Sequence, residues 1–159
     1  MNITYRYDVK SVSSRRFSDC YFLGGVLMEG IPLVRRINSI YLPVSHKKKA
    51  VKWYEDHLGL THPRGPESDI LQLGDGTWVF LEKSITKTTA NFATSGWVEN
   101  GNYEMFSICF ETNDAVGLHE KLQNEGVEVE ELRDEGSCGI QFIFYDLDGN
   151  KFQVFQQPK

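Results

Sequence analysis

Apolar and polar residues alternate along residues 39–44, with the period of two that is typical of a strand burying one face. Between residues 50 and 58 the apolar residues recur at helical spacing instead, which predicts a helix. Ser45 is expected to cap the start of this helix, and Gly59 is expected to end it in the left-handed conformation.

Two apolar segments follow this helix, at residues 70–74 and 77–83. The pair Asp75-Gly76 stands between them, and such a pair between apolar segments is a strong hairpin signal. Residues 85–102 are polar and contain two glycines, so we expect a linker or mobile loop there.

The same order of elements returns further along the chain. Alternation along residues 106–111 predicts a second strand, and apolar residues at helical spacing from 115 to 122 predict a second helix. Asn113 or Asp114 is expected to cap this helix, and Gly126 is expected to end it.

A second set of strands follows the second helix. Residues 127–132 predict a short strand, and residues 140–145 and 151–156 predict a hairpin closed by residues 146–149. A strand–helix–hairpin unit is therefore present twice, and the linker regions leave room for one more strand in each copy. The expected organisation is an extension (1–35), a first unit (36–84), a linker (85–104) and a second unit (105–159).

Residues 1–35 belong to neither copy, and two interpretations of them remain open. The segment Gly24-Gly25-Val26-Leu27-Met28 can be encoded by codons that contain a bacterial ribosome-binding site just before a start codon. Met28 would then be the natural start, and residues 1–27 would be non-native upstream translation. In the other interpretation the segment supplies a native strand that covers a sheet edge.

Composition narrows the class of protein. The 159 residues are 40% hydrophobic and 25% charged, which is an ordinary balance for a globular domain. A net charge of -5 argues against nucleic-acid binding, and the longest apolar run is too short to span a membrane. Three cysteines without metal-ligand spacing are typical of reduced thiols, so we expect a cytoplasmic protein.

Residues 36–157 resemble the vicinal oxygen chelate superfamily, which includes glyoxalase I, bleomycin-resistance proteins, fosfomycin-resistance enzymes and extradiol dioxygenases. The segment 50–60 is similar to the family's first helix and its ending, and residues 144–150 are similar to its Asp-Pro-Asp-Gly-Asn turn. The resemblance implies an α+β fold of two tandem βαβββ units that form a paired open half-barrel. It also implies that the paired cups hold a ligand, and that the protein is a homodimer.

The resemblance further implies four metal-ligand positions, which fall here on Ser39, Phe80, Ser107 and Gln153. Divalent metals prefer carboxylates, imidazoles or thiolates, and these side chains offer neutral hydroxyl and amide groups or no donor at all. We therefore expect no metal and no other cofactor. The four histidines, His46, His57, His62 and His119, do not alternate onto an inward strand face, and we expect them to be solvated or to cap helices.

Alternation predicts which side chains face the cup. Cys109 is expected there as a buried, inert thiol. An aromatic cavity with some acids and amides suits a flat organic ligand, aromatic or cationic. The predicted ligand pocket consists of Ser39, Tyr41, Trp78, Phe80, Glu82, Ser107, Cys109, Glu111, Lys151, Gln153 and Phe155.

Two functions are consistent with this pattern. The first is a small-molecule-binding protein of the glyoxalase/bleomycin-resistance type with a degenerate metal site. The alternative is a metal-dependent lyase, isomerase or dioxygenase, in which Glu82, Gln153 and a histidine from a loop or a partner chain bind the metal. Glu82 is the catalytic candidate of that alternative.

Overall fold

The computed structural model describes residues 21–23, 26–28, 34–95 and 102–158. The chain divides into two compact parts, residues 1–36 and residues 37–159. In the first part, strands β1 (Tyr21–Leu23) and β2 (Val26–Met28) pair antiparallel, with Tyr21 opposite Met28. Whether residues 1–27 are native stays a prediction.

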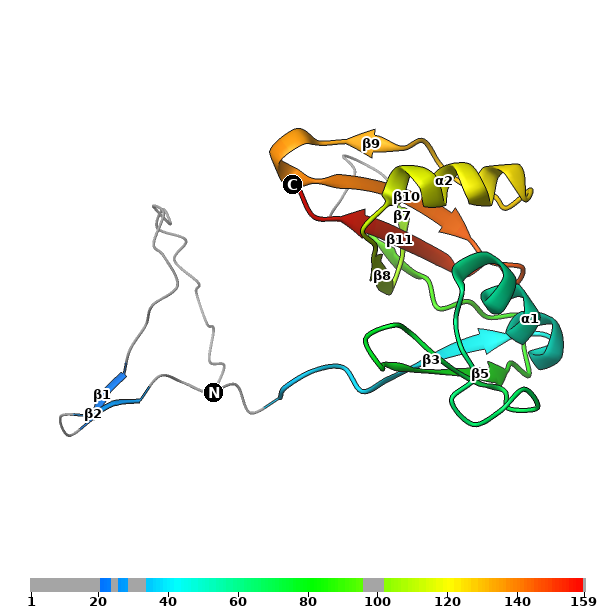
Figure 1. The fold of residues 1–159 in the computed structure, drawn as a ribbon, viewed down its shortest axis with the longest axis horizontal. Helices are drawn as coiled ribbons and strands as arrows, with labels where there is room; N and C mark the ends of the chain where they lie inside the picture. The colour runs from blue at the N-terminus through cyan, green and yellow to red at the C-terminus, as the bar shows by residue number, and fades with distance from the viewer. Residues whose placement is uncertain (1–20, 24–25, 29–33, 96–101, 159) are drawn as a thin grey trace, which may run out of the picture. The chain divides into compact units, whose positions relative to one another are not determined.

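The second part begins with a first repeat that follows the predicted order. It consists of β3 (Ser39–Val44), α1 (Lys47–Leu58), β4 (Ile70–Gln72) and β5 (Trp78–Lys83). The sheet order is β3-β5-β4, because β3 pairs parallel with β5 and β4 pairs antiparallel with it (Figure 1).

The two ends of α1 differ in how well the sequence predicted them. Gly59 ends the helix with φ at 67°, in the left-handed region that a residue without Cβ adopts readily, which confirms the prediction. The predicted cap Ser45 is wrong by one residue, because His46 takes the N-cap position without a side-chain hydrogen bond. The backbone N–H of Ser45 instead donates to Oδ1 of Asp148 at 3.0 Å, in the second repeat.

The second repeat forms the sheet β8-β11-β10-β9 with α2 lying along it (Figure 1). Asp114 caps α2 as expected, its Oδ1 accepting from the Gly117 N–H at 2.9 Å. The strand expected over 127–132 is wrong, since that segment makes only one bridge, Val129 to Phe144. The elements are β8 (Ile108–Glu111), α2 (Ala115–Asn124), β9 (Arg133–Asp134), a 3-10 turn (Gly136–Cys138), β10 (Ile140–Tyr145) and β11 (Lys151–Gln156).

The segment between the repeats contains two strands rather than only a loop. β6 (Phe92–Thr94) pairs antiparallel with β7 (Tyr103–Met105). Two asparagines hold the residues just before β6 in place. Oδ1 of Asn150 accepts from the Ala90 N–H at 2.8 Å, and Oδ1 of Asn91 accepts from the Lys151 N–H at 2.7 Å. These long-range bonds give the polar segment an ordered position that its composition did not predict.

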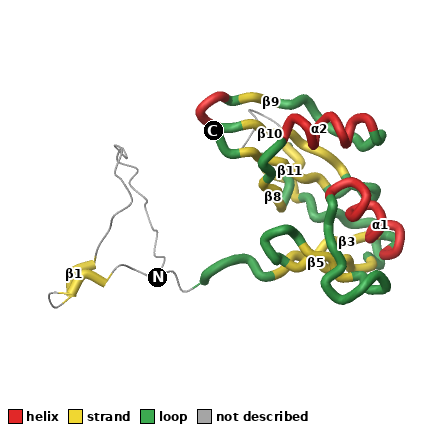
Figure 2. Tube along the Cα trace, viewed as in Figure 1, coloured by secondary structure: helices red, strands yellow, loops and turns green. Residues whose placement is uncertain are grey.

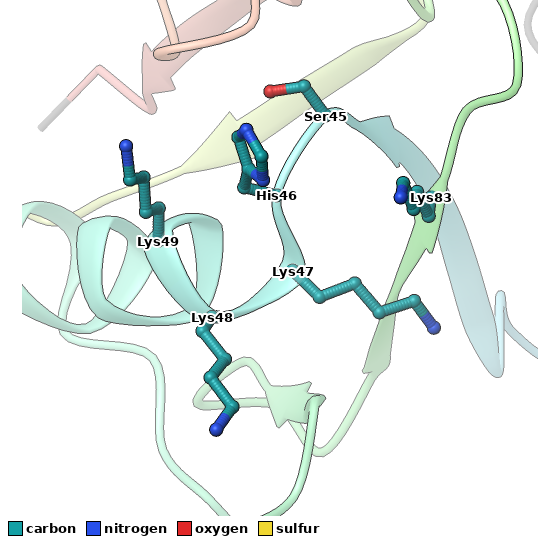
Figure 3. Close-up of a pocket in the computed structure, with 6 residues that line it drawn as sticks. All are labelled: Ser45, His46, Lys47, Lys48, Lys49 and Lys83. Carbon is teal, nitrogen blue, oxygen red and sulfur yellow. The ribbon is translucent and has the colours of Figure 1, made fainter.

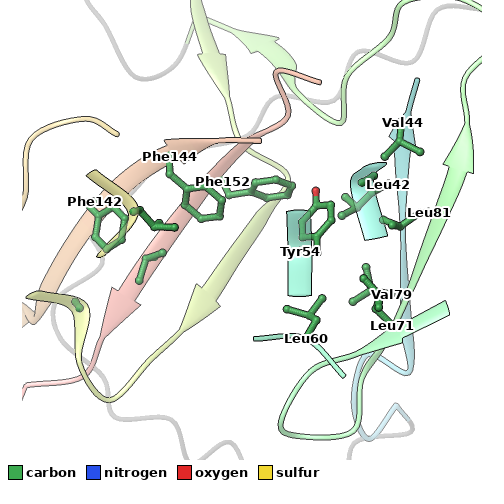
Figure 4. Packing of buried hydrophobic residues seen from close by; sticks show 14 residues of the cluster. Leu42, Val44, Tyr54, Leu60, Leu71, Val79, Leu81, Phe142, Phe144 and Phe152 are labelled. Carbon is green, nitrogen blue, oxygen red and sulfur yellow. The ribbon is translucent and has the colours of Figure 1, made fainter. Parts of the chain in front are cut away.

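One hydrophobic core runs through both repeats (Figure 4). Tyr54 of α1 lies edge-on to Phe152 of β11, with ring centroids 6.4 Å apart, and Trp53 stacks on Phe144 of β10 at 6.3 Å. The helix of the first repeat therefore packs against the sheet of the second (Figure 2). No helix of the described ranges is long and apolar enough to cross a bilayer.

Candidate functional site

Each sheet packs one face against the core and carries the predicted pocket residues on the other. On β3, Leu42 and Val44 are buried, while Tyr41, which directly precedes Leu42, is 62% exposed. The Tyr41 ring stacks on Phe80 of the parallel neighbour β5, with centroids 4.8 Å apart and planes 13° apart. Strand alternation thus gives the first repeat an accessible aromatic face.

Polar side chains border this aromatic face. The Arg64 guanidinium lies over the Trp78 ring, 5.2 Å from its centroid, and Trp78 stands opposite Ser39 in the β3–β5 register. Glu82 pairs with the Lys47 ammonium at 3.1 Å. The carboxylate required by the metal-dependent alternative is therefore engaged in an ion pair.

In the second repeat, the register of β8 against β11 brings another group of predicted residues together. Gln153 stands opposite Cys109, and Phe155 stands opposite Glu111. Ser107, just before β8, donates from Oγ to the carbonyl of Ala90. The predicted residues thus form one group on each sheet.

A pocket of about 680 Å³ opens on the second-repeat sheet. Of the predicted residues, Gln153 and Phe155 line it. The sequence did not single out the other lining residues, although a glutamine within the apolar strand β10 was a visible signal for one of them. These other residues are Tyr103, Met105, Phe106, Glu130, Glu131, Arg133, Gln141, Phe142 and Ile143.

Lys151 lies beside this pocket as a buried cation. Its ammonium donates to the Tyr103 hydroxyl at 3.3 Å and to the Glu104 carbonyl at 3.0 Å, and lies 3.5 Å from the Glu130 carboxylate. Burial alone would lower the pKa of Lys151, but the hydrogen bonds to Tyr103 and Tyr145 and the charge of Glu130 outweigh it and raise the pKa. Lys151 therefore stays charged and holds two pocket-lining residues, Tyr103 and Glu130.

Cys109 differs from its prediction in one respect. The residue is exposed rather than buried, because its strand turns this side chain away from the core. Partial desolvation of the thiol and the negative charge of Glu111 raise its pKa. A thiol with a raised pKa carries little thiolate at neutral pH and is a poor nucleophile.

The four positions implied for a metal do not form a suitable donor set. The Phe80 ring stacks on Tyr41 and offers no donor atom, and Nε2 of Gln153 donates to Gln141 at 2.6 Å. Within the described ranges, no three His, Cys, Asp or Glu side chains are grouped closely enough to hold a metal ion. The residues present therefore do not fit a divalent cation.

Three histidines make specific contacts. Nδ1 of His57 lies 2.7 Å from the Glu125 carboxylate of α2, and Nε2 of His62 lies 2.5 Å from Glu55. Nε2 of His119 lies 3.0 Å from the Glu130 carbonyl. The expectation of solvated or capping histidines is wrong for these three, which connect separate segments.

A second pocket, of about 540 Å³, lies at the start of α1 (Figure 3). It is strongly basic, but Lys47, the cation nearest the helix start, is already bonded to Asp69 and Glu82. Among its lining residues there is no Phe, Tyr or Trp, so it is a weaker candidate for an organic ligand. Its lining residues are Ser45, His46, Lys47, Lys48, Lys49 and Lys83.

The structure repeats a strand, a helix and a strand hairpin within residues 37–159. The sequence profile of the Glyoxalase/Bleomycin resistance protein/Dioxygenase superfamily matches residues 36–154. The chain belongs to this superfamily, and its mixed architecture confirms the predicted α+β fold.

Two curated relatives are similar over most of the chain. The uncharacterized protein YetH of Bacillus subtilis is 24% identical over 124 residues, which covers 76% of this chain and 97% of the relative. Glutathione transferase FosA of Serratia marcescens is 26% identical over 123 residues, which covers 77% of this chain and 81% of the relative.

Solved structures share the fold. TnmS3, an antibiotic binding protein from Streptomyces sp. CB03234, gives a TM-score of 0.57 at 22% identity, covering 80% of this chain and 99% of its own. The fosfomycin resistance protein FosX of Listeria monocytogenes, complexed with Mn(II) and sulfate, gives a TM-score of 0.56 at 15% identity. The match covers 79% of this chain and 92% of FosX. The superfamily thus contains both a protein described as binding an antibiotic and a protein complexed with a metal.

Proposed function

We propose that this protein binds a small, flat organic molecule without a metal, through the pocket on its second-repeat sheet. The observation that carries the proposal is the combination of this pocket with the unsuitable metal positions. Aromatic side chains such as Phe155 and Tyr103 line a space large enough for a drug-sized molecule. The position implied for a metal ligand beside them holds Gln153, a neutral amide already bonded to Gln141.

The relatives support a ligand-binding role of this type. TnmS3 is described as an antibiotic binding protein, and FosA as a glutathione transferase. A chain with the same fold and a degenerate metal site is suited to sequester a ligand rather than to transform it. Glu130 is already paired with Lys151, so Glu131 is the acidic side chain at the pocket that is compatible with a cationic group on the ligand.

A homodimer is part of this proposal. The first-repeat face built around Tyr41, Phe80 and Trp78 is accessible, since Tyr41 is 62% exposed and the other two side chains are half-buried. Two-fold symmetric association is the commonest way to cover such a surface. In such a dimer, the predicted pocket residues of the first repeat in one copy would contribute to the binding site of the other copy. These residues are Ser39, Tyr41, Trp78, Phe80 and Glu82.

The test combines metal analysis with ligand binding. Protein purified without chelator is analysed for bound metal and, by native mass spectrometry, for a co-purified compound. Equilibrium dialysis against a panel of flat aromatic and cationic compounds then compares wild type with Phe155→Ala. We expect no stoichiometric metal, binding of panel compounds by wild type, and a loss of about tenfold in Phe155→Ala from lost stacking.

Phe92→Ala is the matched control, because Phe92 is 51% exposed on β6 and does not line the pocket. It should bind like wild type. Stoichiometric zinc, nickel, manganese or iron would contradict the metal-independent function. Failure of every panel compound to bind, together with the absence of any co-purified compound, would contradict a binding function altogether.

A further inference from the structure

The pocket contains two glutamine side chains that bond to each other. Gln141 lies on β10 and Gln153 on β11, and Nε2 of Gln153 donates to Oε1 of Gln141 at 2.6 Å. Both residues are half-buried, and both line the pocket. We call them the amide pair.

Other strand glutamines use their amides differently. Nε2 of Gln72 donates to the Gly76 carbonyl at 3.1 Å, and Oε1 of Gln156 accepts from the Ala115 N–H at 2.7 Å. These two amides hold backbone groups of a turn and of a helix start. The hydrogen bond of the amide pair instead joins one side chain to the other, so this bond supports neither a turn nor a helix.

The amide pair presents an ordered row of hydrogen-bonding groups. Reading from Gln153 to Gln141, its atoms are acceptor, donor, acceptor and donor. Reversing both amides would also reverse this order, so the assignment in which Nε2 of Gln153 is the donor decides which group each amide presents. Among the described side chains, the one fully buried polar atom without a partner is Oδ2 of Asp148. The remaining groups of the amide pair are therefore either hydrogen-bonded or not fully buried, and both side chains line the pocket, where a ligand can replace water.

Apolar side chains surround the amide pair within the pocket. Phe155 stands opposite Gln141 in the β10–β11 register, and Ile143 stands opposite Gln153. A ligand edge that bonds to the amide pair would thus place its ring among apolar and aromatic side chains. A ligand without matching groups would leave the amides unpaired on binding, at a cost in affinity.

We infer that the amide pair determines ligand specificity, and that the site selects planar aromatic molecules with a lactam or imide edge. Such an edge alternates acceptor and donor groups and so complements the amide pair. This inference rests on the proposed function, because it names the ligand class for the same pocket.

Naphthalimide and N-methylnaphthalimide provide a direct test. The two compounds share a flat ring system and two carbonyl groups, and only the first has the imide N–H. Equilibrium dialysis with fluorescence detection measures both. We expect wild type to bind naphthalimide about tenfold more tightly than the methylated compound, since one donor would be lost and its acceptor left unpaired.

The variant Gln141→Glu separates specificity from packing. A carboxylate at this position can still accept from Nε2 of Gln153, but the group presented to the ligand changes from a donor to an acceptor. Both imides have the two carbonyl groups that lose a donor, so we expect this variant to lose at least tenfold in affinity for each, whereas the preference for the imide N–H is retained because residue 141 can still accept. Gln123→Glu, on the exposed surface of α2, adds the same charge away from the pocket and should behave like wild type.

Equal affinity of wild type for the two imides would overturn the inference and leave the proposed function intact. Unchanged affinity of Gln141→Glu for naphthalimide would also overturn it. If neither imide binds while other aromatic compounds of the panel do, the site is a binding site of a different ligand class and the inference is wrong. Thermal unfolding of each variant confirms that the folded protein is being compared.

Discussion

The hydroxyl of Tyr54 donates a 2.5 Å hydrogen bond to the carboxylate of Asp146 and so joins the two repeats within their shared core. Tyr54 is fully buried on α1, and Asp146 is 7% exposed at the end of β10. Asp146 also accepts from the side chain of Asn150 at 2.7 Å, and from the backbone N–H groups of Asp148 and Asn150. The buried carboxylate therefore organises the hairpin turn and fixes the turn to the helix of the other repeat.

Removal of the Tyr54 hydroxyl should weaken the whole fold. Tyr54→Phe leaves a buried carboxylate with one donor fewer, which costs about 1–3 kcal/mol of unfolding free energy. Urea denaturation followed by circular dichroism measures the change. Tyr41→Phe is the matched control, because the Tyr41 side chain is 62% exposed and its hydroxyl should contribute nothing measurable. Equal stability of Tyr54→Phe and wild type would contradict this account.

The same hydrogen bond predicts sensitivity to alkaline pH. Burial of the phenol, followed by the charge and hydrogen bond of Asp146, raises the pKa of Tyr54 well above its usual value of 10.0. A raised folded-state pKa gives stability that is complete below about pH 10 and is lost as pH rises further. Wild type should therefore lose more unfolding free energy than Tyr54→Phe between about pH 9 and about pH 11. Parallel pH profiles of the two proteins would contradict the prediction.

Asp146 and Asp148 should respond differently to the same substitution. Oδ2 of Asp148 is buried without a hydrogen-bond partner, so Asp148→Asn removes an uncompensated charge and retains the acceptor for the Ser45 N–H. We expect a change within about 0.5 kcal/mol. Asp146→Asn places an amide among several donors and should cost about 2 kcal/mol. Thermal and urea unfolding would compare the two, and a larger loss from Asp148→Asn would contradict the assignment.

The Cys109 thiol should react slowly despite its exposure. Partial desolvation and the charge of Glu111 raise its pKa, which lowers the thiolate fraction at neutral pH. Alkylation by iodoacetamide, followed by peptide mass analysis, should be slower than for free cysteine. Glu111→Gln removes the second cause only, so we expect a modest acceleration. An unchanged rate in Glu111→Gln would show that desolvation alone controls this thiol.

The exposed stack of Tyr41 on Phe80 predicts a C2 homodimer. Tyr41→Glu introduces a charge onto that face, and we expect it to shift a dimer toward monomer in sedimentation velocity runs at tens of micromolar protein. Val116→Glu is the matched control, since Val116 is 41% exposed on α2 away from the stack. A monomeric wild type at this concentration would contradict the dimer.

The sequence predicted those elements whose signals are local. Residues 140–145 and 151–156 form a hairpin with the expected bounds. An Asp-Gly turn between two apolar strands is a signal contained in adjacent residues, so the sequence alone predicts it. The sequence left room for one more strand in the linker regions, but it did not place the β6–β7 pair, since Asn91 and Asn150 hold it through bonds between distant segments. Period-two alternation correctly separated Tyr41 from its buried neighbours.

The composition of the pocket depended on tertiary contacts that alternation does not report. Glu130, Glu131 and Arg133 reach the pocket because their segment runs beside β10. Lys151 sits on a predicted inward position, but its charge is held by Tyr103, Glu104 and Glu130. Alternation along a strand therefore predicts which face of the sheet a side chain lies on, whereas the contacts of that side chain depend on neighbouring segments.

The parallel pairing of β3 with β5 also affects the order in which the chain can fold as it is synthesised. β3 lies at an edge of its sheet and hydrogen-bonds to β5, so its backbone and its apolar side chains Leu42 and Val44 lack a sheet partner until the ribosome has passed Lys83. The second repeat has the same arrangement, because β8 waits for β11 at the end of the chain. In each repeat a nascent strand with an unpaired edge precedes its partner by a helix and at least one strand, which makes it a natural binding site for chaperones during translation.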